Sequence, residues 1–344
     1  MNASELPLVS IIVPMRNEER CVGACLDSIL ANEYPEGKLE ILVVDGQSTD
    51  RSREIVQAKI RRNPQIRLLG NPQGITPIAM NIGIRASKGE VVCIINAHAH
   101  VSPDFIKRSV QTLQEHEEAD AVGGALCSVN EKRLGKAIAL ALNSPLGAGG
   151  ARYRTRTTPG LIRDTVPYAV YRRTVFTRIG LIDEELVRNQ DAEFNYRLLR
   201  MGGRIYFNPD ILSYLTARAS LRQLTKQQFQ TGYWKVKLLQ KIFLKTNWRH
   251  LVPAVFVVVT AVSGIAAVFS TWGKWIFFAD VGAYAAAVGV SSCFLGLRHG
   301  AKNLLLLPWV FSVIHISYGI GMNKGVWDFV IRPSRNSMPG KAEP

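Results

Sequence analysis

Residues 8–18 read LVSIIVPMRNE, and the fold is predicted from this stretch outward. Val9 to Pro14 is a short apolar run rich in β-branched residues, which is typical of a buried strand. From Val22 to Leu30 apolar residues recur at i, i+4, i+7 and i+8, which is the spacing of an amphipathic helix. The stretch therefore predicts a strand, a polar turn and a helix in succession.

The same alternation continues to residue 95. Further strands and helices are predicted, the strands at residues 39–44, 66–69 and 91–95 and the helices up to residue 60 and over 76–86. Alternating strands and helices indicate an α/β fold with a parallel sheet. Ligands of such sheets bind beyond the carboxyl ends of the strands. Polar residues follow three of the four strands and are the candidate ligand contacts, at residues 16–18, 45–48 and 96–98.

Three segments, VSIIVPMRNE (9–18), VVDGQSTD (43–50) and NIGIRASKGE (81–90), resemble the family 2 glycosyltransferases, in particular those of bacterial exopolysaccharide synthesis. The resemblance extends over residues 8–245. It implies a GT-A fold, that is, a Rossmann-like mixed sheet with flanking helices, in a catalytic domain over residues 1–217. It also implies an inverting hexosyltransferase that uses a nucleotide diphosphate sugar, with UDP as the expected nucleotide.

The resemblance implies a donor site at the ends of the first two strands. Pro14, Arg16 and Glu18 are expected to frame the ribose and the base, and Asp45 to accept a hydrogen bond from the uracil ring. An ionised carboxylate suits a base N–H because it can only accept hydrogen bonds. For Asp45, a turn or helix cap before Gly46 is the alternative.

The family carries an Asp-x-Asp motif after the fourth strand, where carboxylates bring Mg²⁺ or Mn²⁺ to the donor's diphosphate. This chain has Asn96, Ala97 and His98 there. Asn96 and Ala97 are expected at the donor, and His98 at the metal, because Mn²⁺ accepts a neutral imidazole. His100 competes for that role, and a site without metal stays open. The expected cofactor is Mn²⁺ or Mg²⁺.

Asp191 is the predicted catalytic base, because inverting transfer needs a group that takes the proton of the acceptor hydroxyl. It matches the second residue of the family's Glu-Asp pair, with Gln190 in place of the Glu. A helix predicted over 190–201 offers another explanation, because an acid near a helix N-terminus interacts favourably with the helix dipole. Both roles are compatible.

Four residues are tentative acceptor contacts. Asp164 lies in a DTVP stretch that resembles the same subgroup, with a loop-anchoring turn as its alternative. Arg152 and Arg154 are expected to clamp a lipid-linked pyrophosphate, or else form a solvated charge run. Trp234 is expected to stack on a sugar or to anchor the chain at a membrane interface.

Much of the net charge of +15 is carried by the segment before the C-terminal apolar region. Residues 218–250 contain Lys and Arg but no Asp or Glu, and apolar residues interleave with them. This composition predicts basic amphipathic helices on a membrane surface. Nucleic acid is not a favoured partner, because no zinc-finger, helix-turn-helix or RNP-like signature accompanies the charge.

Three apolar stretches follow, at residues 251–271, 275–297 and 303–321. Each is long enough to cross a bilayer, which takes about 20 residues. About three transmembrane helices are therefore predicted over 251–321, followed by a tail over 322–344. Three crossings would put the basic residues of the tail opposite Arg249, against the positive-inside tendency, so an in-plane or re-entrant segment stays open.

The five cysteines form no C-x-x-C pair, and the start of the chain lacks a basic stretch followed by an apolar one. We therefore expect a multi-pass protein of a bacterial-type inner membrane with a cytoplasmic catalytic domain. The expected partners are a UDP-sugar, a lipid-linked (polyprenyl) or glycan acceptor, and membrane lipids. The alternative is a non-catalytic nucleotide-sugar-binding membrane protein, because both acids of the Asp-x-Asp motif are missing.

Overall fold

The computed structural model describes residues 6–242 and 248–332. Chain packing divides the protein into two compact units, one of Met1–Cys127 with Arg156–Thr216 and the other of Ser128–Thr155 with Ala217–Pro344. Residues 128–155 thus fall inside the predicted catalytic domain but pack with the C-terminal helices. The extent of the catalytic domain, residues 1–217, stays a prediction.

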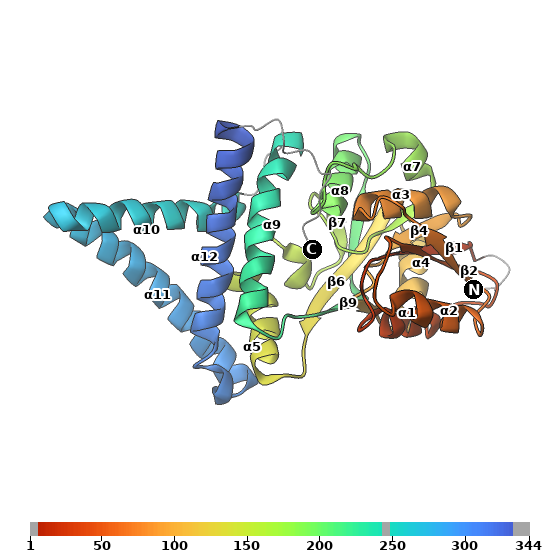
Figure 1. The fold of residues 1–344 in the computed structure, drawn as a ribbon, viewed down its shortest axis with the longest axis horizontal. Helices are drawn as coiled ribbons and strands as arrows, with labels where there is room; N and C mark the ends of the chain where they lie inside the picture. The colour runs from red at the N-terminus through yellow and green to blue at the C-terminus, as the bar shows by residue number, and fades with distance from the viewer. Residues whose placement is uncertain (1–5, 243–247, 333–344) are drawn as a thin grey trace. The chain divides into compact units, whose positions relative to one another are not determined.

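Within its described residues, the first unit holds a nine-stranded mixed sheet with flanking helices (Figure 1). The strands are β1 (Val9–Met15), β2 (Leu39–Asp45), β3 (Ile66–Gly70), β4 (Val91–Ile94), β5 (Ala99–Val101), β6 (Ala121–Val129), β7 (Gly160–Ile162), β8 (Val170–Arg172) and β9 (Ile205–Thr216). Their order is β3-β2-β1-β4-β8-β6-β9-β5, with β7 beside β9. The pairs β1–β2, β1–β4 and β2–β3 are parallel, whereas β4–β8, β6–β8, β5–β9 and β7–β9 are antiparallel.

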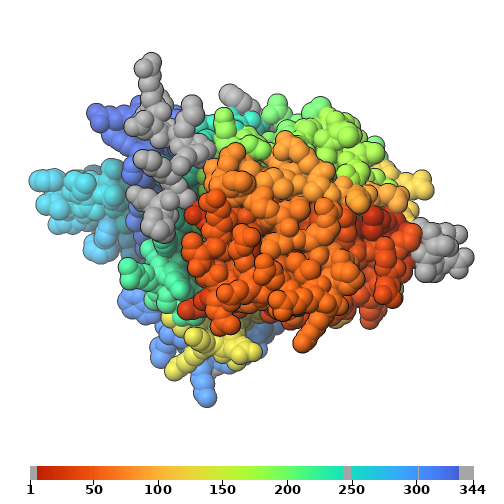
Figure 2. Space-filling model, turned by 45° about the vertical axis from the view of Figure 1, so that its right-hand side comes forward, coloured from red at the N-terminus to blue at the C-terminus, as the bar shows by residue number. Residues whose placement is uncertain are grey.

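The helices of this unit are α1 (Val22–Leu30), α2 (Ser52–Ile60), α3 (Thr76–Ala86), α4 (Phe105–Glu115), α7 (Thr174–Ile179) and α8 (Gln190–Arg200). Every residue of β1 is buried, as a strand covered by helices on both faces requires. The predicted α/β sheet with flanking helices is confirmed, and α3 has the predicted bounds. Figure 2 shows a face of this unit that the segments up to about residue 100 form, coloured red to orange.

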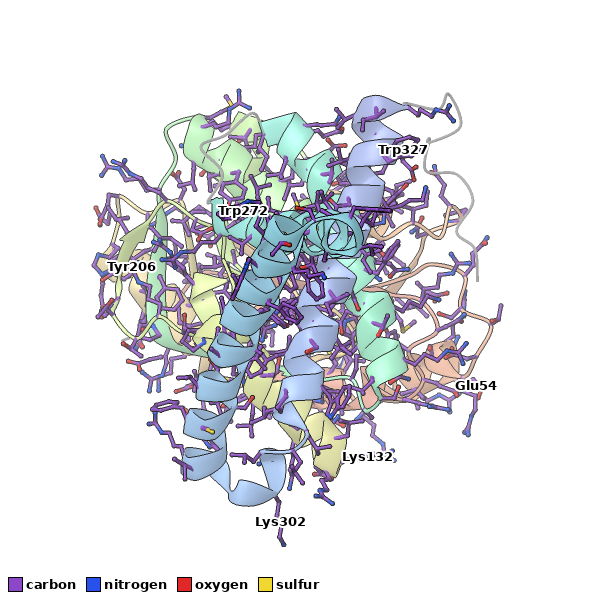
Figure 3. All side chains as sticks on the ribbon, turned by 90° about the vertical axis from the view of Figure 1, so that its left-hand side faces the viewer. Glu54, Lys132, Tyr206, Trp272, Lys302 and Trp327 are labelled. Atoms are coloured by element: carbon purple, nitrogen blue, oxygen red, sulfur yellow. The ribbon has the colours of Figure 1, made fainter. Side chains whose placement is uncertain are left out.

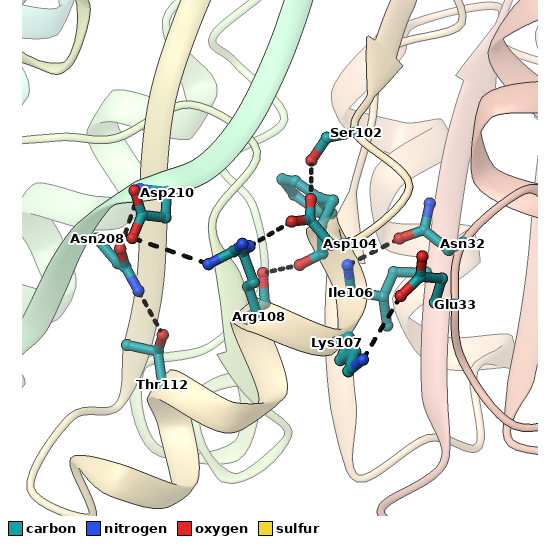
Figure 4. Close-up of polar contacts among 12 residues, drawn as sticks. Asn32, Glu33, Ser102, Asp104, Ile106, Lys107, Arg108, Thr112, Asn208 and Asp210 are labelled. Carbon is teal, nitrogen blue, oxygen red and sulfur yellow. Dashed lines mark hydrogen bonds and ion pairs between the residues drawn. The ribbon is translucent and has the colours of Figure 1, made fainter.

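Polar contacts fix the start of α4 (Figure 4). Asp104 accepts a hydrogen bond from the Ser102 hydroxyl at 2.7 Å and pairs with Arg108, which also lies 3.8 Å from Asp210. Burial alone opposes ionisation, but the hydrogen bonds from Arg108 and Ser102 hold the pKa of Asp104 below its ordinary value. These contacts tie α4 to the sheet through β9.

The second unit consists of helices. Its α-helices are α5 (Arg133–Leu142), α6 (Pro145–Ala148), α9 (Leu221–Ile242), α10 (Val252–Phe269), α11 (Thr271–His299) and α12 (Leu307–Val326). Its short turns are the 3₁₀ helices η2 (Arg152–Arg154), η3 (Trp248–His250) and η4 (Ala301–Asn303) and the π-helical turn η5 (Trp327–Ile331).

Helices α9 and α12 lie side by side (Figure 1). Glycines permit this close approach. A Cβ atom at Gly232 would lie 2.2 Å from the Tyr318 carbonyl oxygen, and one at Gly321 would lie 2.1 Å from that of Phe229. The predicted basic helix is α9, and its apolar residues, such as Leu224, are buried inside the unit. Its placement on a membrane surface stays a prediction.

About three transmembrane helices were predicted, and two helices of the described chain meet the length and composition that a membrane crossing requires. Among the described residues, α10 and α11 are long and apolar enough to cross a membrane. The third predicted stretch, 303–321, forms most of α12, where Leu307, Val310 and Phe311 are fully buried in the helical core of the unit. Protein therefore covers one side of α12, whereas Trp309, Ile316 and Ile320 are exposed. The predicted tail continues through η5, and residues 333–344 lie outside the described residues.

Helices α10 and α11 form a hairpin with apolar side chains on its outside. Phe269 is 84% exposed and Leu297 is 85% exposed, and Trp272 lies at the end where the two helices meet (Figure 3). Asp280 interrupts the apolar surface of α11, and its carboxylate accepts a hydrogen bond from the Thr260 hydroxyl at 2.5 Å. This bond joins the two helices.

Candidate functional site

A pocket lies at the carboxyl ends of β1, β2, β3 and β4 in the first unit. Its polar lining side chains are Arg16, Glu18, Asn71, Thr76, Asn96 and His98. Its empty space is about 430 Å³, part of it open to solvent. The parallel register explains the gathering, because it places Met15 beside Asp45 and Asp45 beside Gly70 at one edge.

Two turns at this edge brace each other. Asn17 has a left-handed backbone with φ 54°, which asparagine tolerates better than most residues. The Asn17 N–H donates to the Ser48 hydroxyl at 2.9 Å, and the Thr49 N–H donates to Asn17 Oδ1 at 2.8 Å. The Glu18 N–H donates to the Ser52 hydroxyl at 2.7 Å. The backbone on both sides of Glu18 is therefore fixed.

Asp50 belongs to the same brace. Its carboxylate accepts from the N–H of Glu19 at 3.1 Å and from the N–H and hydroxyl of Ser52 at 3.0 and 2.5 Å. Burial alone would raise the pKa of Asp50, but these hydrogen bonds lower it below its ordinary value. Asp50 thus holds the start of α2 and the turn after β1 together.

Arg16 lines the pocket and donates a hydrogen bond to the Gly74 carbonyl at 3.1 Å. Gly74 has φ +67°, and a Cβ atom there would lie 3.0 Å from the Arg16 guanidinium and 3.2 Å from the Gly46 carbonyl. Only glycine fits this close approach without strain. The remaining N–H groups of Arg16 are suited to a phosphate or a base carbonyl.

Asp45 lies beneath the pocket rather than on its surface. It is 2% exposed, its Oδ2 is 2.9 Å from the Arg53 guanidinium, and its Oδ1 accepts the Ser48 N–H at 3.2 Å. The turn-forming role considered for Asp45 is therefore observed. Its predicted contact with uracil stays a prediction, because the pocket is lined at this strand by Gly46.

Asn71 is a pocket residue that the sequence analysis missed. It is buried, its Nδ2 donates to the Ile75 carbonyl at 2.9 Å, and its Oδ1 has no hydrogen-bond partner within residues 6–242 and 248–332. A buried acceptor without a partner costs about 1–3 kcal/mol, so a ligand N–H would relieve it. The sequence pattern that could have identified Asn71 is a polar residue followed by a Pro-Gln-Gly turn after the third predicted strand.

The segment after β4 alternates between core and pocket. Ala97 is buried in the hydrophobic core, whereas Asn96 and His98 line the pocket. His100 lies in β5 opposite Tyr214 and outside the pocket lining, and burial lowers its pKa. Of the two histidines considered as metal ligands, His98 is therefore the one placed at the pocket.

His98 Nδ1 lies 2.9 Å from Glu18 Oε1. In the described part of the chain no three His, Cys, Asp or Glu side chains converge as a metal site. A cation would therefore need oxygens from the donor's diphosphate besides one imidazole nitrogen. This donor set fits Mn²⁺ better than Mg²⁺, which prefers oxygen ligands.

Asp191 is the exposed second residue of α8. The preceding Asn189 has a left-handed backbone, φ 60°, which turns the chain into the helix. Tyr171 in β8 is fully buried, and burial followed by the negative charge of Asp191 raises its pKa well above the ordinary value. Asp191 therefore lies near β8.

Hydrogen bonds hold the DTVP stretch against α8. Buried Asn195 accepts from the Tyr171 hydroxyl at 2.7 Å and donates to the Thr165 hydroxyl at 2.8 Å. The Tyr196 hydroxyl donates to Asp164 Oδ1 at 2.8 Å. The structure thus brings Asp164 and Asp191 to the same helix, although Asp164 also has the anchoring role considered for it.

Glu193, the other acid of the first turn of α8, is buried and forms two 2.9 Å contacts with the Arg197 guanidinium. Arg197 also donates to the carbonyls of Ile179 and Leu181. Glu193 therefore orients Arg197, which holds α8 to the preceding segment.

The other acceptor candidates belong to the second unit. Arg154 donates to the Ser128 hydroxyl at 2.8 Å, so its guanidinium is used within that unit, whereas the side chain of Arg152 is exposed. Trp234 packs against Phe329, and the Lys237 ammonium lies 5.7 Å from its ring centroid. These contacts fit either role predicted for Trp234.

Residues 10–180 match the family model described as Glycosyl transferase family 2. The chain is 28% identical over 333 residues to the succinoglycan biosynthesis protein ExoA of Rhizobium meliloti (strain 1021), covering 96% of this chain and 98% of that protein. It is 26% identical over 328 residues to the dolichyl N-acetyl-alpha-D-glucosaminyl phosphate 3-beta-D-2,3-diacetamido-2,3-dideoxy-beta-D-glucuronosyltransferase of Methanococcus voltae, covering 92% and 98%.

Among solved structures, the fold is similar to that of the mannosyltransferase PcManGT from Pyrobaculum calidifontis in complex with GDP-Man and Mn²⁺. The TM-score is 0.60 at 20% identity, with 95% of this chain and 89% of that chain covered. At this identity the likeness concerns the fold.

Proposed function

The chain belongs to family 2 of the glycosyltransferases through its residues 10–180, and from this we propose that it transfers a sugar from a UDP-sugar to a polyprenyl-linked acceptor with inversion. The observation that carries the proposal is the pocket at the edge of β1 to β4, where Arg16, Glu18, Asn71 and His98 meet. Membership of an enzyme family favours catalysis over the non-catalytic alternative.

In this proposal the nucleotide lies across the ends of β1, β3 and β4. Pro14 and Asn96 flank it, Arg16 offers N–H groups to a phosphate or a base carbonyl, and the unpartnered Oδ1 of Asn71 accepts a base N–H. Uracil has one such N–H, at N3. Asp45 lies below this floor and is the alternative acceptor for that N–H. The GDP-Man complex of the structural relative supports a nucleotide sugar in this fold.

The chemical step is assigned to Asp191, the exposed acid in the first turn of α8. The acceptor hydroxyl oxygen attacks the anomeric carbon, its proton passes to the Asp191 carboxylate, and UDP leaves with the electron pair of the broken glycosyl–phosphate bond. The N-terminus of α8 favours the ionised carboxylate by about 0.3–1 kcal/mol. His98 would hold a Mn²⁺ ion, which neutralises the charge that develops on the leaving diphosphate.

A lipid-linked acceptor fits both the relatives and the apolar hairpin. The Methanococcus voltae relative is named for transfer to a dolichyl-phosphate-linked sugar. Helix α10 has 18 residues and spans about 27 Å, close to the roughly 30 Å of a bilayer core. We assign Asp164 to the acceptor sugar, Arg152 and Arg154 to the lipid phosphate, and Trp234 to the membrane interface.

A two-helix hairpin also resolves the charge conflict. Two crossings return the chain to the side from which it entered, so Lys324 and Arg332 lie on the same side as Arg249, as the positive-inside tendency requires. We therefore propose a cytoplasmic catalytic domain at a bacterial-type inner membrane.

The test is nucleotide release by the full chain in detergent. UDP- and GDP-sugars would be supplied with Mn²⁺, Mg²⁺ or EDTA, with and without a polyprenyl-phosphate-linked sugar, and the released nucleotide measured. We expect metal-dependent release of UDP from one UDP-sugar, accelerated by the lipid acceptor. Release from GDP-sugars alone would refute the UDP assignment, and no release under any of these conditions would contradict the proposed transfer.

A further inference from the structure

Glu18 and His98 form a direct pair inside the pocket, although 80 residues separate them in the chain. The Nδ1 to Oε1 distance is 2.9 Å, and both side chains are partly buried. An ionised carboxylate can only accept, so His98 Nδ1 carries the proton and donates it. The lone pair of the neutral ring is then on Nε2, which is the nitrogen left for a ligand.

Glu18 is held from several directions. Its N–H donates to the Ser52 hydroxyl, and its carbonyl accepts the N–H groups of Cys21 and Val22 at 2.9 Å, where α1 begins. The left-handed Asn17 precedes it and is bonded to the neighbouring turn. A carboxylate on so constrained a backbone can fix the orientation of the imidazole that it contacts.

We propose that Glu18 is a positioning residue for the metal, and that its pair with His98 presents Nε2 to a cation carried by the donor's diphosphate. A carboxylate behind a ligating imidazole fixes its tautomer and raises its basicity. The pair takes the place of the acids missing at 96–98 and favours Mn²⁺ over Mg²⁺. This inference rests on the proposed function, because the diphosphate supplies the remaining ligands. It moves Glu18 from the nucleotide to the metal.

The test separates metal affinity from nucleotide affinity. Binding of UDP, and of GDP in parallel, would be measured calorimetrically on the full chain in EDTA. Free Mn²⁺ would then be followed by electron paramagnetic resonance at saturating nucleotide. The variants are Glu18→Ala, Glu18→Gln and His98→Ala. The control is Glu19→Gln, because Glu19 is adjacent but lies outside the pocket lining.

We expect Glu18→Ala to weaken Mn²⁺ binding to the nucleotide complex about 10–100-fold, with nucleotide affinity in EDTA unchanged. Glu18→Gln should lie between Glu18→Ala and the wild type, because the amide oxygen still accepts from Nδ1. His98→Ala should lose the most, and Glu19→Gln nothing. Unchanged nucleotide affinity in EDTA also shows that the variants are folded.

Two results would overturn the inference alone. One is wild-type Mn²⁺ affinity in Glu18→Ala. The other is an equal loss of nucleotide affinity with and without metal, which would return Glu18 to the nucleotide. Equal Mg²⁺ and Mn²⁺ affinity in the wild type would refute the predicted metal preference. A wild-type chain that binds neither UDP nor GDP would instead contradict the proposed function, and the inference with it.

Discussion

In the first unit the apolar side chains of β1, such as Ile11 and Val13, are fully buried, whereas in the hairpin of the second unit Phe269 and Leu297 are more than four-fifths exposed. The first arrangement is that of a domain folded in water. The second leaves large apolar surface uncovered, which in a stable protein marks a surface that contacts lipid or another protein. The contrast fits the proposal that the first unit carries the chemistry and that the hairpin of the second anchors the protein.

Asp191→Asn should give the largest effect and should fall on the first unit alone. Loss of the base is expected to lower the transfer rate about 10²–10⁴-fold, while UDP binding and membrane association stay unchanged. Single-turnover transfer would measure the rate, and calorimetry would measure UDP binding. Asp210→Asn is the matched control, because Asp210 is exposed and contacts Arg108 away from the pocket. Transfer at the wild-type rate by Asp191→Asn would remove Asp191 from the mechanism.

Ile265→Lys should affect the second unit alone. Ile265 is 66% exposed in the C-terminal half of α10, and a lysine within a membrane-crossing helix costs up to about 2.5–3.5 kcal/mol, the value at the helix centre. Flotation with liposomes should show a shift from the membrane to the soluble fraction, with UDP affinity unchanged. Ser270→Lys, at the turn of the hairpin, should float like the wild type, because its ammonium can reach water. Full flotation of Ile265→Lys would argue that α10 does not cross the bilayer.

Gly321→Ala should destabilise the packing of α9 on α12. The added Cβ would meet the Phe229 carbonyl, and overpacking costs about 1–3 kcal/mol. Gly282→Ala in α11 is the matched control, because its Cβ meets nothing within 4 Å and should stabilise the helix by about 0.4–1 kcal/mol.

Tryptophan fluorescence reports this change selectively. All six tryptophans follow residue 217 and so lie in the second unit. Urea unfolding followed by fluorescence should shift to lower urea in Gly321→Ala, while UDP binding by the first unit is retained. An unchanged midpoint would mean that α9 and α12 tolerate a wider separation.

The fold of the first unit was predictable because local periodicity and global topology agree there. The strand from Val9 and the helix over 76–86 appear at nearly their predicted bounds. The third apolar stretch could not be assigned from its sequence, because about 20 apolar residues suit either lipid or a protein core. Phe311 is buried by α5 and α9, which are distant from it in sequence. The glycines that allow α9 and α12 to approach are recognisable only once the two helices are seen in contact.

The site was predictable wherever it depends on strand ends. The parallel register alone places Arg16 and His98 at one edge. The hydrogen-bond and ion-pair partners of each side chain were not predictable, because they depend on the direction in which the side chain points in the folded structure. Glu18 contacts His98, and Asp45 lies inward and contacts Arg53. Both directions are set by the two turns that brace each other at the sheet edge. Asn71 was missed because Gly70, and not a polar residue, directly follows the third predicted strand.

Asp50→Ala should give the smallest effect, a local loosening of the first unit that leaves the hairpin untouched. Loss of this capping acid should cost about 1 kcal/mol at pH 7. The folded pKa of Asp50 is lowered, so its stabilisation is present above the unfolded value, about 3.9, and is lost as pH falls through the folded value. Hydrogen exchange of α2, compared with the wild type at each pH, should show a difference that is constant above pH ~5 and shrinks below ~4.

Glu54→Ala is the control for this comparison, because Glu54 pairs with Arg51 at 3.5 Å with both side chains largely exposed. Such a pair contributes little, so the exchange of α2 should change by less than about 0.5 kcal/mol at any pH. A pH-independent effect of Asp50→Ala would mean that Asp50 acts through packing rather than charge. The brace between the two turns, and with it the rigid placement of Glu18, would then rest on the Asn17 and Ser52 hydrogen bonds alone.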